Sequence, residues 1–273
     1  MRDRATFISE VERWAAGRPD VRAAMLVGSA ARSETPADEW SDVDIALFVD
    51  DPVPYLDEDG WLAAFGTPLL TFVERTAVGG SRERRVLFTD AFEADFAIFP
   101  AADCARVAAD PGARETLRRG YRVLVDEVGV DWSLEAPAPQ PQPSRELDEL
   151  ANDVWYHALW AAKKLRRGEL WVARSCVDCY LHGCLLELAA LHARALDPAA
   201  DTWHGGRFVE RWARADVVEG LWDSLASSPD DVAGAIRRTV SLFDRLADET
   251  AALLLTSVGV DRAAVAVLLD ALL

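Results

Sequence analysis

Every second residue is proline between positions 137 and 143, within the segment EAPAPQPQPS. Proline lacks a backbone N–H and fixes φ, so such a run cannot continue a helix or a sheet ladder and favours an extended connector. We therefore expect two domains, residues 1–134 and 144–273, joined by a proline-rich linker over residues 135–143. A chain of 273 residues, 51% of them hydrophobic, is long enough to bury two ordinary cores.

The two parts differ in their hydrophobic periodicity. Before the linker, helical spacing at residues 3–16, 57–65 and 101–119 alternates with apolar runs at 21–27, 43–49, 68–74, 84–89, 94–99 and 121–126. The runs RRVLFTD and EADFAIFP are separated by a few residues and predict a hairpin. After the linker only helical spacing remains, interrupted mainly at Gly168 and Gly183. The sequence predicts an α/β domain with a mixed sheet, followed by an all-α helical bundle.

Two aspartates stand at the start of a predicted strand, opposite a Gly-Ser turn. Residues i and i+2 of a strand point to the same side, so Asp42 and Asp44 project together. Paired carboxylates form an oxygen site of the kind that Mg²⁺ uses together with substrate phosphates. Gly28 ends the preceding strand, and the amides after it, with the Ser29 hydroxyl, can hold phosphate oxygens. The pattern predicts a site for Mg²⁺ and a nucleoside triphosphate.

A later strand offers a third carboxylate. Two-metal transfer of phosphoryl or nucleotidyl groups uses such a group on a neighbouring strand, and Asp95 in EADFAIFP is placed for it. Glu93 would share the same face and is the second choice. A carboxylate here can orient and deprotonate an attacking hydroxyl. The alternative, that these aspartates only end strands at exposed turns, does not account for the combination of Gly-Ser, Asp-x-Asp and a later strand with Asp.

The net charge indicates which classes of molecule the protein can bind. The chain has 46 acidic and 29 basic residues, a formal net charge of −17. Such a surface repels nucleic acid and anionic membranes and attracts cations. With no apolar stretch that could span a bilayer and no signal core at the N-terminus, we expect a cytoplasmic protein. Cys176, Cys179 and Cys184 are expected to line a helical core on one face rather than bind zinc.

These motifs resemble the nucleotidyltransferase superfamily, whose signature is Gly-Ser followed at a distance by Asp-hydrophobic-Asp. More closely, the chain is similar to the aminoglycoside 6-adenylyltransferases that inactivate streptomycin. The similarity includes GSAARSETPADEWSDVDIALFV, GWLAAFGTPLL, the Asp95 strand with AIFP, the helix RELDELANDVWYHALWAAKKLRRGELWVAR, and GRFVERW at 206–212. One departure is that Ala30 follows the serine where members usually carry arginine, so that Arg32 is the nearest arginine.

The resemblance implies transfer of AMP from ATP to a hydroxyl of an aminoglycoside, with release of pyrophosphate. Two Mg²⁺ ions would lie at Asp42, Asp44 and Asp95, and Asp95 would activate the hydroxyl. The helical domain would supply carboxylates for the cationic sugar. The candidate ATP-binding residues are Gly28, Ser29, Arg32, Lys163 and Arg207, and the candidate acceptor-binding residues are Glu149, Asn152, Asp153 and Trp155.

Other interpretations of the same residues remain open. Glu149, Asn152 and Asp153 share one helix face and can also form an ordinary charged surface, while a tryptophan in a bundle commonly packs in the core. The chemistry can serve a hydroxyl of another small molecule or of a protein. The fold can also bind nucleotide without turnover, as an antitoxin-like or regulatory protein, although the intact Asp42, Asp44 and Asp95 favour an enzyme.

Overall fold

The computed structural model describes residues 2–32, 37–77, 80–132, 144–202 and 205–273. The chain divides into two compact units, Met1–Ala136 and Pro137–Leu273. The predicted linker at residues 135–143 lies outside the described residues.

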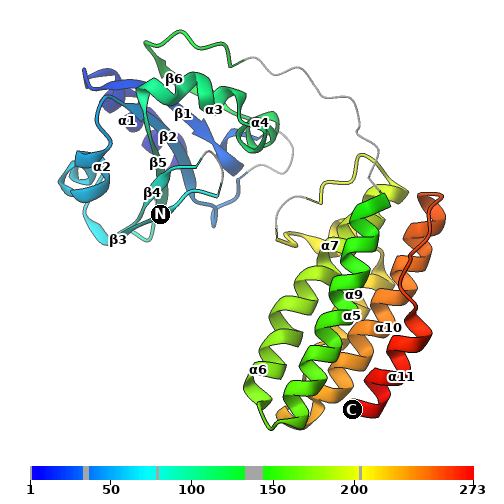
Figure 1. The fold of residues 1–273 in the computed structure, drawn as a ribbon. Helices are drawn as coiled ribbons and strands as arrows, with labels where there is room; N and C mark the ends of the chain where they lie inside the picture. The colour runs from blue at the N-terminus through cyan, green and yellow to red at the C-terminus, as the bar shows by residue number, and fades with distance from the viewer. Residues whose placement is uncertain (1, 33–36, 78–79, 133–143, 203–204) are drawn as a thin grey trace. The chain divides into compact units, whose positions relative to one another are not determined.

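Among the described residues of the first unit, six strands form one mixed sheet in the spatial order β3-β4-β5-β2-β1-β6 (Figure 1). The central pair β2 and β5 runs parallel, and every other neighbouring pair is antiparallel. The predicted mixed sheet is confirmed, and so is the hairpin, formed by β4 and β5. The strands are β1 (Val21–Val27), β2 (Val43–Val49), β3 (Pro68–Arg75), β4 (Arg82–Phe88), β5 (Glu93–Pro100) and β6 (Arg122–Asp126).

Helices cover both faces of this sheet, because the central strands are apolar on both sides. In β2, Ile45 and Leu47 join the core under α1, whereas Ala46 and Phe48 join the core under α3 and α4. The helices of the unit are α1 (Arg4–Ala16), α2 (Val53–Asp57), α3 (Cys104–Ala109) and α4 (Pro111–Arg118). The aspartate at position 44 therefore belongs to the face that α3 and α4 cover.

The helix expected over residues 57–65 is not continuous. The α-helix α2 ends at Asp57, Glu58 is extended, and the 3₁₀ turn η2 follows over Gly60–Ala64. A 3₁₀ turn repeats every three residues, which brings Leu62 and Phe65 to the same side, and both side chains are buried. The hydrophobic spacing is thus satisfied by a different helical geometry from the one predicted.

All the regular elements among the described residues of the second unit are helices, which confirms the predicted bundle. The long helices α5, α7, α10 and α11 lie side by side around one apolar core (Figure 1). The elements are α5 (Ser144–Arg166), α6 (Leu170–Ser175), the π-helix η4 (Cys176–Leu181), α7 (His182–Leu196), α8 (Val209–Trp212), α9 (Ala215–Asp223), the 3₁₀ turn η5 (Pro229–Asp231), α10 (Val232–Leu253) and α11 (Arg262–Leu272).

A π-helix changes the register in the cysteine-containing segment. The chain breaks at Gly168 as predicted, but Gly183 lies within α7 and interrupts nothing. Cys176 and Cys184 are buried in the core, whereas Cys179 is exposed. The expectation that the three thiols share one face is wrong for Cys179, because the wider turn of a π-helix shifts each following side chain away from the 100° spacing of an α-helix.

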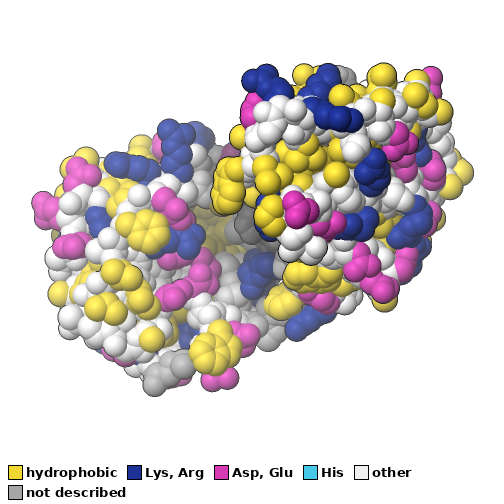
Figure 2. Space-filling view, turned by 90° about the horizontal axis from the view of Figure 1, so that it is seen from below, with side chains coloured by type: hydrophobic (Ala, Val, Ile, Leu, Met, Phe, Trp, Pro, Cys, Tyr) yellow, Lys and Arg dark blue, Asp and Glu magenta, His cyan; other side chains and the backbone are white. Residues whose placement is uncertain are grey.

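Charged side chains are distributed over both units. Figure 2 shows acidic and basic side chains interspersed on the visible face of each unit rather than gathered in one patch. Among the described residues, no helix combines the length and the apolar character that crossing a membrane requires.

Candidate active site

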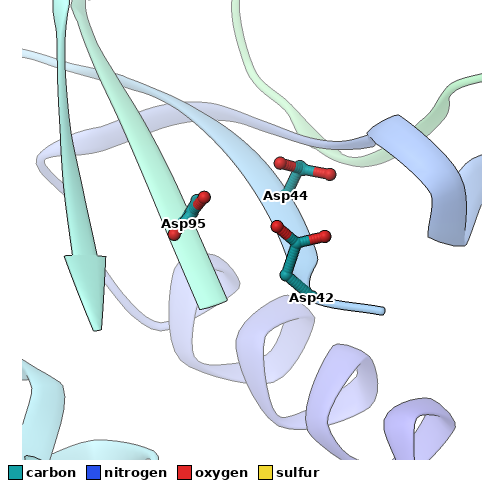
Figure 3. A group of neighbouring side chains, drawn as sticks. All are labelled: Asp42, Asp44 and Asp95. Atoms are coloured by element: carbon teal, nitrogen blue, oxygen red, sulfur yellow. The ribbon is translucent and has the colours of Figure 1, made fainter. Parts of the chain in front are cut away.

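The parallel pairing of β2 with β5 brings the three predicted aspartates together. In its register Asp44 lies opposite Asp95, so both side chains project from the same face of neighbouring strands. Asp42 precedes β2 by one residue and has the same parity as Asp44. One carboxylate oxygen of each residue lies within 4.8 Å of the others, and Figure 3 shows the three groups beside one another at the start of the two strands.

Burial and the repulsion of neighbouring charges make Asp44 and Asp95 hard to ionise while no cation is bound. Burial raises the pKa of Asp44 to about 7, and the negative charges of Asp42 and Asp95 add to the effect. Burial also raises the pKa of Asp95 to about 7, opposed by the positive charge of Arg85. Asp42 and Asp44 are partly buried and Asp95 is buried. A bound cation would offset this repulsion, which is the usual reason for clustering carboxylates in a protein.

The Gly-Ser turn closes one side of the aspartate cluster. Gly28 opens the 3₁₀ turn η1 (Gly28–Ala31) with φ +66°, and a Cβ at this position would lie 1.8 Å from Oδ2 of Asp44. Glycine is therefore required both by the backbone conformation and by the closeness of the carboxylate. Ser29 is buried, and its Oγ has no hydrogen-bond partner among the residues that the structure describes.

These observations fit a site for divalent cations. Three carboxylates offer the oxygen ligands that Mg²⁺ prefers, and a buried hydroxyl left without a partner can serve a phosphate oxygen beside them. Arg32 ends the η1 turn with an extended backbone and is partly buried. Glu93, the second choice for the third carboxylate, is exposed and lies outside the aspartate cluster.

Arg85 is a neighbour of the cluster that the sequence interpretation missed. It lies on β4 directly opposite Asp95 in the antiparallel pairing with β5, and its Nη1 forms an ion pair of 3.2 Å with Asp95 Oδ2. The same guanidinium contacts Glu74 and Glu83. The hairpin RRVLFTD–EADFAIFP was visible in the sequence, and extending its register would have placed an arginine beside Asp95.

A cavity of about 620 Å³ opens in the helical unit, with carboxylates in its wall. Glu149 and Asp153 of α5 line it together with Glu187 and Arg194 of α7. Arg194 donates a hydrogen bond of 2.7 Å from Nη1 to Thr202 Oγ1. Three carboxylates and one guanidinium leave the wall net negative, and such a wall attracts ammonium or guanidinium groups. Glu187 was not predicted from the sequence, because it lies on a helix distant in the chain from α5.

Asp153 is fixed in this wall by one contact from the π-helix η4 and one from its own helix α5. The hydroxyl of Tyr180 donates to Asp153 Oδ2 at 2.8 Å, and His157 Nδ1 lies 2.8 Å from Oδ1. The hydrogen bond to Asp153 raises the pKa of Tyr180 to about 12, so the phenol stays a donor at neutral pH. Tyr180 belongs to the π-helix η4, a local irregularity that periodicity alone does not predict.

The structure places the other predicted residues of the helical unit elsewhere. Trp155 is 3% exposed in the core and donates its indole N–H to Asp244 Oδ1 at 3.1 Å, so packing accounts for it and the expected sugar contact is not supported. Asn152 donates to the carbonyl oxygen of Asp148 on its own helix. Lys163 is exposed ten residues after Asp153, about 15 Å along α5. Arg207 is exposed, and its guanidinium lies 5.6 Å from the Phe208 ring centre.

Comparison with known proteins gives matches along the chain. A family model described as streptomycin adenylyltransferase matches residues 1–263. An aminoglycoside 6-adenylyltransferase of Campylobacter jejuni is 26% identical over 161 residues, 56% of this chain and 54% of that protein. A protein of the same description from Bacillus subtilis (strain 168) is 24% identical over 183 residues, 63% of this chain and 62% of that protein. The chain thus spans somewhat more than half the length of these curated relatives.

Two solved structures are similar to this chain at lower sequence identity. The crystal structure of an aminoglycoside 6-adenyltransferase from Bacillus subtilis gives a TM-score of 0.47 at 16% identity, covering 100% of this chain and 99% of that one. A nucleotidyltransferase-like protein from Exiguobacterium sibiricum 255-15 gives a TM-score of 0.34 at 12% identity, covering 91% and 77%.

Proposed function

Because the chain belongs to the streptomycin adenylyltransferase family, we propose that it transfers AMP from ATP to a hydroxyl group of an aminoglycoside such as streptomycin. The hydroxyl oxygen attacks the α-phosphorus, a P–O bond forms, and the bond to the leaving pyrophosphate breaks. The observation that carries this proposal is the meeting of Asp42, Asp44 and Asp95 within 4.8 Å beside the buried hydroxyl of Ser29. ATP as the donor makes the cytoplasm the expected compartment, and detoxification of an antibiotic the expected role.

Asp42, Asp44 and Asp95 would hold two Mg²⁺ ions. When bound, the ions would neutralise the phosphate charge and polarise the α-phosphate. Carboxylates are suited to this role because they supply charge and oxygen ligands at once. The backbone amides after Gly28 and the Ser29 hydroxyl would bind the phosphate oxygens, since both are hydrogen-bond donors beside the aspartate cluster and the hydroxyl has no partner among the described residues.

Asp95 would also remove the proton of the attacking hydroxyl. A carboxylate within hydrogen-bond reach of the attacking hydroxyl can orient it and accept its proton. The buried setting restricts the orientation of the carboxylate. The proton therefore moves from the hydroxyl oxygen to a carboxylate oxygen of Asp95 as the P–O bond forms.

The carboxylate-lined cavity of the helical unit would bind the acceptor. An aminoglycoside carries several ammonium or guanidinium groups, and Glu149, Asp153 and Glu187 provide anionic partners for them. Asn152, Lys163 and Arg207 remain predictions as further ligands: Asn152 for the acceptor, and the two cations, with Arg32, for the phosphates of ATP.

The test is pyrophosphate release from ATP and Mg²⁺, measured with and without streptomycin. We expect release to require streptomycin and to fall at least about 100-fold in Asp95→Asn. The matched control is Glu93→Gln, which removes a carboxylate two residues away on β5, where the side chain is exposed. Release without any dependence on Asp95 would overturn its assignment as base. Metal-dependent ATP turnover with other cationic sugars but not with streptomycin would move the proposal to another acceptor.

A further inference from the structure

Arg85 connects three carboxylates at the edge of the aspartate cluster. Its Nε lies 2.5 Å from Glu74 Oε1, its Nη2 3.0 Å from Glu83 Oε1, and its Nη1 3.2 Å from Asp95 Oδ2. The contact with Asp95 is the longest of the three. Glu74 is on β3 and Glu83 on β4, so the guanidinium ties neighbouring strands to the strand that carries Asp95.

The preceding residue in the chain, Arg84, shows how an arginine with a purely structural role is held in this sheet. Arg84 is buried and donates from Nε to the carbonyl oxygen of Tyr55 and from Nη1 to Thr71 Oγ1, and thereby anchors α2 to the sheet. The side chain of Arg85 is 41% exposed, and its ion pairs are all with carboxylates. Arg85 is therefore held by ion pairs rather than by packing, and one of its partners, Asp95, belongs to the expected metal site.

A positive charge at this place acts on any cation that approaches the cluster. The charge of Arg85 opposes the raised pKa of both Asp44 and Asp95, so both carboxylates sense it. The same charge repels a divalent cation at short range and attracts phosphate. We propose that Arg85 holds Asp95 in the metal-free protein and lowers the affinity of the site for a free divalent cation, so that the cation binds tightly only together with a nucleoside triphosphate.

This inference rests on the proposed function, because it takes the three aspartates as metal ligands. Arg85 is a positioning residue here and acts through Asp95. Release of Asp95 to a cation leaves the guanidinium with Glu74 and Glu83, since its five donors can serve several acceptors. The negative phosphates of the nucleotide then offset the charge that excludes the cation alone. The charge of Arg85 would therefore make tight binding of the cation depend on the nucleotide.

The experiment measures Mn²⁺ binding to the full chain by the EPR signal of free Mn²⁺, with and without a non-hydrolysable ATP analogue. The variants are Arg85→Gln, which removes the charge, and Arg85→Lys, which keeps it. Arg82→Gln is the matched control, because it removes a charge three residues away on β4, about 10 Å distant and on the opposite face of the strand. The double variant Arg85→Gln with Asp44→Asn tests where the ion binds.

Without nucleotide, we expect Arg85→Gln to bind Mn²⁺ at least about five-fold tighter than wild type, and Arg85→Lys and Arg82→Gln to stay within about two-fold. The gain should vanish in the double variant. The analogue should tighten Mn²⁺ binding more in wild type than in Arg85→Gln. A loss of local structure would weaken binding, so a tighter Mn²⁺ site cannot come from a purely structural role.

Two results would overturn the inference. One leaves the proposed function intact, and the other contradicts the proposed function as well. If wild type binds Mn²⁺ at the aspartates and Arg85→Gln binds it equally or more weakly, Arg85 does not control loading, and the proposed function stands. If wild type binds no Mn²⁺ even with the analogue, the metal site of the proposed function fails, and the inference fails with it.

Discussion

Replacement of Gly28 by alanine is the sharpest test of how closely the Gly-Ser turn and the aspartate cluster are fitted. Gly28 has φ +66°, and a methyl group there would lie 1.8 Å from Oδ2 and 2.6 Å from Cγ of Asp44. Both distances are far inside van der Waals contact. Either the η1 turn or the Asp44 side chain must therefore move, and each carries part of the proposed site.

The expected loss of unfolding free energy in Gly28→Ala has two contributions, which a control variant can separate. A left-handed backbone costs alanine about 1–2 kcal/mol relative to glycine, and overpacking a filled space costs about 1–3 kcal/mol more. Gly28→Ala should thus lower the free energy of unfolding by about 2–5 kcal/mol. Gly129 has φ +68° with no described atom within 4 Å of the added Cβ, so Gly129→Ala should lose only the first part.

The assays are urea unfolding and pyrophosphate release on both variants. We expect Gly28→Ala to lose at least about 100-fold in turnover, because displaced carboxylates no longer match the phosphates. Gly129→Ala should keep near-normal turnover. Equal stability losses in the two variants, together with near-normal turnover of Gly28→Ala, would refute the reasoning that the turn and Asp44 are in tight contact.

Three further predictions concern the carboxylates and the helical unit. With EDTA present, the folded state binds protons at Asp44 and Asp95 more tightly than the unfolded chain, so their stabilisation is present below about pH 4 and lost as the pH rises through about 7. Asp44→Asn should therefore gain on the order of 2–4 kcal/mol in unfolding free energy over wild type between pH 4 and 8; a constant difference would contradict this. Tyr180→Phe should raise the KM for the acceptor about 3–10-fold with the KM for ATP unchanged, because Asp153 loses a hydrogen-bond donor. An unchanged KM for the acceptor would mean that Asp153 does not contribute to acceptor binding. Trp155→Phe should lower the free energy of unfolding by about 1–3 kcal/mol and leave both KM values unchanged, and a raised acceptor KM would restore the predicted sugar contact.

Local patterns in the sequence were sufficient for most of the helices and strands and for the direction of the aspartate side chains. Period-two alternation indicated that Asp42 and Asp44 share a side, and the same rule placed Asp95 away from Ala94 and Phe96. The family resemblance noted from the same motifs is confirmed by the match over residues 1–263. The parallel pairing of β2 with β5, which brings Asp44 and Asp95 together, is a long-range choice that no local window contains.

What the sequence did not yield depends on tertiary contacts or on irregular backbone. Arg85 became a partner of Asp95 through cross-strand register, and Glu187 joined Asp153 through helix packing. Tyr180 reaches Asp153 from a π-helix, whose spacing differs from the α-helical period used to interpret the segment. Trp155 was predicted to bind the acceptor because its chemistry suits a sugar, but the apolar face of α5 buries it, which is the alternative that the sequence left open.

The central parallel pair also has a consequence for how the protein folds. β1 and β2 are sequential antiparallel neighbours, and so are β3, β4 and β5, so each group can form from contacts close in the chain. The β2–β5 pairing joins the two groups across about 50 residues, and closing such a loop is slow compared with forming a hairpin. Asp44 and Asp95 meet only when this pairing forms. Cation binding by all three aspartates would therefore follow hairpin formation in refolding and would report on the joining of the two groups of strands.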